Sequence, residues 1–231
     1  MKKRLNGFTV AAMLGLVALV GAPQAYATAE LRITDGTNTV DIVDQSGAGT
    51  VCTGAVTGCT DANGGVNVVT FVGTIGTWTL NVSTGSSHGA SVGTDLDLNT
   101  TNSTSAASNL TIQFSDTGFV SGGHNFTVGG TLQAPAGSSL TFTEYAGAAK
   151  FALTNQIGST LVFTATPFAG ATGGSAVGTA LTEQVVLHFT GAGSTSFNAA
   201  LTPVPEPTSI ALFGGMLLFT VSAIRRRTRR A

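Results

Sequence analysis

Two aspartates and an asparagine, closely spaced over residues 95–99, are the side chains of this 231-residue sequence best placed to bind a ligand. Asp95, Asp97 and Asn99 alternate with two leucines, which would set three oxygen-bearing side chains on one face of a strand. Calcium binds about six to eight such oxygens. The pattern makes these three residues candidate calcium ligands. However, no EF-hand loop is present, and a solvated strand face is the alternative interpretation.

Three further acids, Asp116, Glu144 and Glu183, could supply the carboxylate pair of a glycoside hydrolase. Their spacing along the chain does not establish that any two of them face each other. A sugar cleft also normally has aromatic platforms, and beyond residue 27 only Trp78 and Tyr145 accompany the phenylalanines. The composition therefore weakens both a glycosidase and a lectin interpretation.

Residues 85–89, Gly-Ser-Ser-His-Gly, match the G-x-S-x-G pattern of a hydrolase nucleophile elbow. That motif needs a strand before it and a helix after it, whereas a turn-like stretch and another strand-like segment follow here. A chain with 31 glycines produces such matches by chance. His124 and His188 lie in strand-like segments and are interpreted as ordinary sheet residues. We therefore expect no catalytic residue and no enzyme activity.

Alternation of apolar and polar residues predicts the elements that position these side chains. Residues 77–83 and 109–115 alternate strictly, which is typical of strands with one buried face. Shorter segments of the same kind are residues 66–72, 125–128, 140–145, 159–166 and 184–189. About ten short strands, separated by Gly, Asn and Ser clusters, predict an all-β fold, an antiparallel and jelly-roll-like β-sandwich over residues 28–202.

The basic residues are concentrated at the two ends of the chain. Residues 28–202 contain ten acidic residues but only Arg32 and Lys150 as bases, a balance of −8. A surface of that sign repels phosphate backbones, so the sequence predicts no nucleic-acid partner.

The first 27 residues have the three regions of a secretory signal peptide. Basic residues at positions 2–4 precede an apolar segment, residues 8–20, and Ala25-Tyr26-Ala27 fits the cleavage rule. The apolar segment is too short for a transmembrane span of about 20 residues. We expect a signal-peptide helix with cleavage after Ala27, and cleavage after Ala29 is the alternative. In an exported protein, Cys52 and Cys59 are then predicted to form a disulfide, since zinc would need two more ligands at motif spacing.

Residues 203–231 have three parts in a fixed order. A proline-rich segment comes first, and an apolar segment over 209–224 is predicted to be a short transmembrane helix. Basic residues close the chain, and by the positive-inside rule they stay cytoplasmic while the body lies across the membrane. The proline-rich motif is Val204, Pro205, Glu206, Pro207 and Thr208, and the basic cluster is Arg225, Arg226, Arg227, Arg229 and Arg230.

This tail resembles the PEP-CTERM sorting signal, and the resemblance covers about 27 residues. It implies an exosortase, a membrane cysteine transpeptidase-like enzyme, as a partner, with processing near the Pro-Glu-Pro. It also implies export through the inner membrane of a Gram-negative bacterium that makes extracellular polysaccharide. The destination is then the cell surface or matrix. The alternative is an unprocessed single-span membrane anchor.

The sequence thus predicts a non-enzymatic surface or matrix protein with a structural or adhesive role, which uses a Thr/Asn/Ser-rich strand face. Exopolysaccharide is a candidate partner, and calcium is the one candidate cofactor. The alternative function is a carbohydrate- or calcium-binding module at the same location. Ice binding and hydrolysis are weaker alternatives, because the threonine pairs are irregularly spaced along the chain and no catalytic constellation is present.

Overall fold

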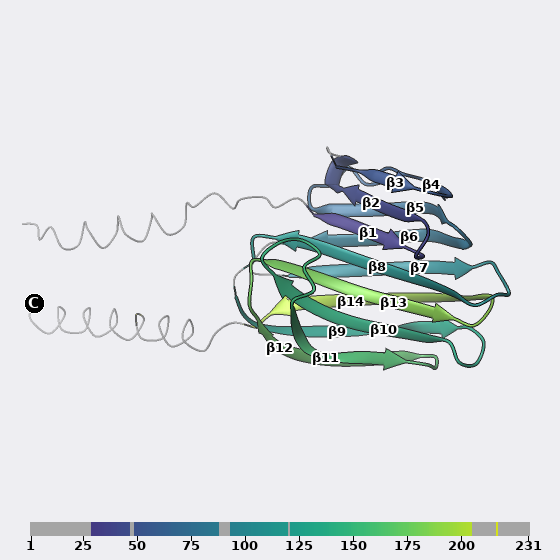
Figure 1. The fold of residues 1–231 in the computed structure, drawn as a ribbon. Coiled ribbons are helices and arrows are strands. Elements are labelled where there is room, and N and C mark those ends of the chain that lie inside the picture. Colours follow the sequence, from purple (N-terminus) through teal and green to yellow (C-terminus); the bar gives the residue numbers. More distant parts are fainter. Residues whose placement is uncertain (1–28, 47–48, 88–92, 120, 205–215, 217–231) are drawn as a thin grey trace, which may run out of the picture.

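The computed structural model describes residues 29–46, 49–87, 93–119, 121–204 and residue 216. Fourteen strands lie in these ranges (Figure 1). They are β1 Glu30–Thr34, β2 Thr39–Val43, β3 Val51–Thr53, β4 Val56–Thr57, β5 Val68–Ile75, β6 Trp78–Ser87, β7 Thr94–Asn102, β8 Ser108–Thr117, β9 Gly122–Gln133, β10 Ser139–Gly147, β11 Asn155–Phe163, β12 Phe168–Ala176, β13 Ala180–Phe189 and β14 Gly193–Pro203.

The predicted signal peptide, residues 205–208 of the sorting motif and the arginine cluster lie outside the described residues, as does all of the predicted helix except residue 216. Within the described ranges, no helix combines the length and the apolar character needed to cross a membrane.

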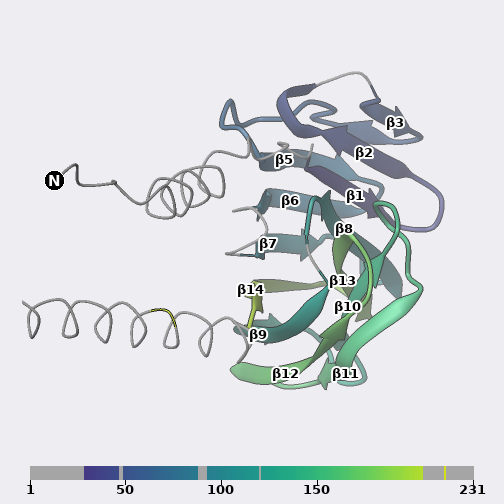
Figure 2. The ribbon, with the colours of Figure 1, turned by 90° about the vertical axis from the view of Figure 1, so that its left-hand side faces the viewer.

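The strands form two seven-stranded sheets. Sheet I has the order β11-β10-β13-β8-β1-β2-β3, and sheet II has the order β12-β9-β14-β7-β6-β5-β4. Every strand pair in the described residues is antiparallel. Figure 2 shows the two sheets as facing layers. The predicted all-β antiparallel sandwich is confirmed, with more strands than the eight of a simple jelly roll.

The core fills the space between the two sheets because apolar residues recur at every second position of the strands. Trp78 on β6 is fully buried, and its ring centroid lies 5.0 Å from that of Phe189 on β13 in the opposite sheet. Phe142 on β10 likewise contacts Phe197 on β14, with ring centroids 4.9 Å apart. These contacts hold the sheets together at several points along their length.

The chain passes directly from one sheet to the other at both lateral edges. At one edge β3 of sheet I leads into β4 of sheet II, and a disulfide joins Cys52 to Cys59 across this passage with the Cα atoms 6.0 Å apart. The predicted disulfide is confirmed. At the other edge β11 leads into β12, and the backbone N–H of Ser159 donates a 2.8 Å hydrogen bond to Oγ1 of Thr172.

Candidate functional site

The three candidate calcium ligands lie on β7 as their alternation predicts. The two leucines between them point into the core and are at most 3 % exposed, so Asp95, Asp97 and Asn99 project from the outer face of sheet II. Nδ2 of Asn198, opposite Asp97 on β14, donates a 2.7 Å hydrogen bond to Oδ1 of Asp97. Among the described residues, no group of three or more His, Cys, Asp or Glu side chains could hold a metal ion. Calcium binding at this face stays a prediction.

Hydroxyl and amide groups extend across the outer face of sheet II beyond β7. Asn99 lies opposite Ser196 on β14, and Ser196 lies opposite Thr131 on β9. The hydroxyl oxygens of Ser196 and Thr131 are 2.9 Å apart. We call this surface the polar face. Its defining residues, all half-buried or exposed, are Asp95, Asp97, Asn99, Thr101, Thr127, Thr131, Ser194, Ser196, Asn198 and Thr202.

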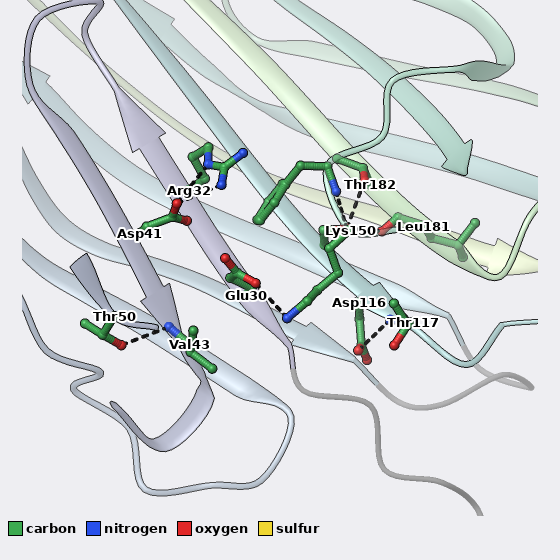
Figure 3. Close-up of polar contacts among 12 residues, drawn as sticks. Glu30, Arg32, Asp41, Val43, Thr50, Asp116, Thr117, Lys150, Leu181 and Thr182 are labelled. Atoms are coloured by element: carbon green, nitrogen blue, oxygen red, sulfur yellow. Dashed lines mark hydrogen bonds and ion pairs between the residues drawn. The ribbon is translucent and has the colours of Figure 1, made fainter. Parts of the chain in front are cut away.

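The outer face of sheet I carries both basic residues of the described sandwich. Arg32 on β1 donates from Nε and Nη2 to Oδ2 of Asp41 on β2, at 3.1 and 2.7 Å. Nζ of Lys150 lies 2.6 Å from Oε2 of Glu30. Figure 3 shows the two ion pairs close together on this face. Each base of the sandwich therefore has an acid of the neighbouring strand or loop as its partner.

The β10–β11 loop, residues 148–154, folds back over the same face. The backbone N–H of Phe151 donates a 3.2 Å hydrogen bond to Oγ of Ser115 on β8. The Arg32 guanidinium lies 4.1 Å from the centroid of the Phe151 ring, which is a cation–π distance. Together with Lys150 these contacts fasten the loop to β1 and β8.

Glu144 and Glu183 lie opposite each other on the neighbouring strands β10 and β13. Both side chains point between the sheets and are 2 % exposed. The Thr94 hydroxyl on β7, in the opposite sheet, donates a hydrogen bond to Oε1 of Glu183. Oε2 of Glu183 and both carboxylate oxygens of Glu144 are buried without a hydrogen-bond partner. The structure thus brings two of the candidate hydrolase acids together, but inside the sandwich, where a sugar chain has no access.

Burial dominates the electrostatics of this pair. It raises the pKa of Glu183 from the usual 4.5 to about 8, and the charges of Asp95 and Asp97 act in the same direction, while the hydrogen bonds from the Thr94 hydroxyl and the Leu201 backbone N–H oppose the rise. Burial also raises the pKa of Glu144 well above its usual value, and the charge of Glu183 adds to that effect. Near neutral pH the pair therefore retains bound protons.

Ser87, the candidate nucleophile of the G-x-S-x-G match, ends β6 and is 7 % exposed. Its side chain hydrogen-bonds to Asp116 on β8, and this bond opposes the rise in the Asp116 pKa that burial causes. Gly85, the first glycine of the match, is required for packing, because a Cβ atom there would lie 2.0 Å from the Phe114 ring. The next described element is β7, a strand rather than the helix that the nucleophile elbow needs.

The two histidines of the sheets have local partners. Nδ1 of His188 lies 2.7 Å from Oδ1 of Asn109, and Nδ1 of His124 lies 3.1 Å from the carbonyl oxygen of Gly122. Within the described ranges, neither histidine shares a hydrogen bond with Ser87. The described residues therefore contain no Ser–His pair of the kind that activates a serine nucleophile.

No protein-family model and no curated protein matches this chain. Some solved structures are similar over part of it. The carbohydrate-binding module TmCBM61, solved with β-1,4-galactotriose, gives a TM-score of 0.34 at 6 % identity over 48 % of this chain and 71 % of the module. The module CBM6cm-2 from Cellvibrio mixtus lichenase 5A, solved with cellotriose, gives a TM-score of 0.27 at 16 % identity over 47 % of this chain and 79 % of the module.

Proposed function

We propose that this chain is a non-enzymatic exported protein, which an exosortase sorts to the cell surface or extracellular matrix of a Gram-negative bacterium. Its role there is structural or adhesive, beside extracellular polysaccharide. The signal peptide and the PEP-CTERM-like tail of the sequence support the route. After processing, the chain leaves the membrane in which its C-terminal helix had held the precursor.

One observation supports a structural or adhesive role most directly. The polar face is exposed, whereas Glu144 and Glu183, two of the candidate hydrolase acids, are buried. The polar face presents hydroxyls and amides with Asp95 and Asp97 as its only charges, a composition suited to hydrogen bonding with neutral sugar hydroxyls. Glu144 and Glu183 are buried between the sheets, and among the described residues Ser87 contacts an acid rather than a histidine. A binding surface therefore fits this sandwich better than a catalytic cleft.

Cell fractionation of the full-length protein tests the sorting. The protein is followed in the host and in a strain without the exosortase, and a Glu206→Ala variant is followed in the host as a matched control. We expect a shortened product at the surface or in the medium of the host alone. Full-length protein in the inner membrane of every strain would contradict the proposal.

A carbohydrate-binding module is the second candidate, favoured by the hydroxyl and amide rows of the polar face. Calorimetric titration of the exported protein with the host polysaccharide, and separately with calcium, tests it. Thr131→Glu places a charge on the polar face, and Thr141→Glu is the matched control on the outer face of sheet I. We expect weakened polysaccharide binding for Thr131→Glu alone. Absence of heat in both titrations would rule out this module.

A further inference from the structure

The buried acid pair has no basic partner within the described sandwich. Arg32 and Lys150, its only bases, lie on the outer face of sheet I and form ion pairs with Asp41 and Glu30. Glu144 and Glu183 therefore face each other in the interior with two donors, the Thr94 hydroxyl and the Leu201 backbone N–H, both to Glu183, and three of their four oxygens have no hydrogen-bond partner. An ionised carboxylate in such a place needs a compensating charge or several donors.

Two ionised carboxylates on directly opposed residues of neighbouring strands repel each other at close range. A proton on either acid removes this repulsion and supplies an O–H donor to a pair that is short of donors. We propose that Glu144 and Glu183 hold protons in common and form, with Thr94, a proton-dependent clamp between the two sheets. The clamp holds this end of the sandwich closed while the pair is protonated. As the pair ionises, repulsion between the two buried charges loosens it, although the hydrogen bond from Thr94 opposes this loosening.

The surroundings of the clamp strengthen its dependence on protons. The charges of Asp95 and Asp97 on β7 raise the pKa of Glu183, and Asp116 lies on β8, the strand beside β13. His124, on the inner face of β9, hydrogen-bonds to Gly122, and Lys150, whose charge acts on Asp116, lies on the outer face of sheet I beside Glu30. Ionisation of the pair would therefore meet mainly like charges from the strands packed around it.

The clamp lies where the described sandwich begins and ends. Leu31, the second residue of β1, is in the same cross-strand row as Glu183, and Leu201, near the end of β14, pairs with Thr94. Loosening should therefore expose the backbone at the end of β14 and at the ends of β6 and β7 that adjoin it. The opposite end of the sandwich, at Trp78 and Phe189, should stay closed because its inter-sheet contact is between apolar rings.

The direction of the pH effect follows from proton binding. The folded pair has pKa values above the usual 4.5, so it binds more protons than the unfolded chain between that pH and about 8. Stability then falls as the pH rises through this window and levels off above it. A sandwich in which these acids were simply solvated would show no such fall.

Thermal unfolding of the exported protein between about pH 5 and about pH 9 tests the clamp. We expect the Tm of the wild type to fall as the pH rises. We expect Glu183→Gln, which keeps the shape and cannot ionise, to lose most of this fall. Glu30→Gln, a matched change outside the core, should follow the wild type. A wild-type Tm that is constant or rises over this range, or a Glu183→Gln Tm that falls as steeply as the wild type, would overturn the proposal.

Two measurements on the wild type keep the test decisive if the glutamine variant does not fold. The infrared carbonyl band of a protonated, buried carboxylic acid should persist at about pH 7 and disappear toward about pH 9. The hydrogen-exchange protection factor, which corrects for the faster intrinsic exchange at high pH, should fall at Leu201 over the same range while that of Trp78 stays unchanged. Loss of the band already near pH 5 would overturn the clamp. Restoration of the alkaline Tm by calcium, and its reversal by EDTA, would equally overturn it by assigning the pair to a cation.

Discussion

The acids on the outer face of sheet I and the acids between the sheets experience opposite environments in the same fold. On the outer face, Glu30 and Asp41 each lie within 2.7 Å of a basic nitrogen and remain partly in contact with solvent. In the interior, Glu144 and Glu183 face each other, are 2 % exposed and have one hydroxyl donor between them. With ten acids and two bases in residues 28–202, the described sandwich forms its ion pairs on the outer face, where water still reaches the charges.

This contrast separates two contributions to stability that would otherwise be confused. Partly exposed ion pairs gain little, because water solvates the separated charges almost as well and salt screens them. Buried acids gain or lose much more, because removing an ionised carboxylate from water costs several kcal/mol unless it is protonated or well hydrogen-bonded. The pH dependence of this protein should therefore originate in the interior and its salt dependence on the outer face.

Replacing the interior pair by apolar residues should have the largest effect. The double variant Glu144→Met, Glu183→Leu should raise the free energy of unfolding by about 1–4 kcal/mol near neutral pH, a gain similar to that found when apolar residues replace buried ion pairs. The gain should increase toward about pH 9, because both acids of the wild type are then ionised in the interior and destabilise the folded state. Urea unfolding at several pH values measures it. A gain that does not depend on pH would show that packing, and not ionisation, distinguishes the two regions.

Removing the Thr94 hydroxyl, which donates across the two sheets to Glu183, should have a smaller effect on stability. This effect should grow as the pH rises. Thr94→Val keeps the shape of the side chain but deletes its hydroxyl. The loss should be about 1 kcal/mol at acid pH, where Glu183 is neutral, and should rise toward about 2 kcal/mol at alkaline pH, because hydrogen bonds to charged groups are the stronger ones. Thr100→Val, a buried threonine of the same strand whose hydroxyl bonds to a backbone carbonyl, is the control and should cost the same at every pH.

Local alternation was enough to predict strands such as β6 and β8, whose apolar residues recur strictly at every second position. It was not enough for β12, where six of the nine residues are glycine or alanine and the strand forms because β9 offers it a ladder of hydrogen bonds. The strand predicted over residues 159–166 lay too far along the chain, since β11 begins at Asn155 and ends at Phe163. Strand order and register depend on packing between distant segments, so they could not be predicted.

The same limit applies to the candidate site. The orientation of Asp95, Asp97 and Asn99 was correctly predicted, because it depends only on alternation within one strand. The meeting of Glu144 and Glu183 depends on the pairing of β10 with β13, which the spacing along the chain does not encode. A local signal was nevertheless present, because Glu183 occupies the apolar phase of Leu181, Val185 and Leu187. An acid in phase with the core residues of a strand indicates a buried carboxyl from the alternation alone.

On the outer face, Arg32→Ala should cost about 1–2 kcal/mol. It removes the two hydrogen bonds of a partly exposed ion pair with Asp41, together a contribution of about 0–1 kcal/mol, and the cation–π contact with Phe151, a contribution of about 0.5–1 kcal/mol. The cost should vary little with pH between about 5 and 9, in contrast to that of Thr94→Val. Hydrogen exchange at Phe151 should accelerate, because the loop over sheet I loses one of its fastenings. A cost that rises steeply with pH would place this residue in the same electrostatic network as the interior pair.

Lys150→Ala should have the smallest effect and the clearest dependence on salt. The Nζ–Oε2 contact with Glu30 joins side chains that are 25 and 16 % exposed, so the pair should contribute about 0–1 kcal/mol at low ionic strength. About 1 M salt shortens the Debye length to about 3 Å and should remove most of that contribution. Lys150→Met keeps an apolar side chain of similar length, so its effect on stability reports the loss of the charge alone. If either variant lost stability equally at low and high salt, the outer ion pair would resemble the interior acids, and the distinction between the two regions would fail.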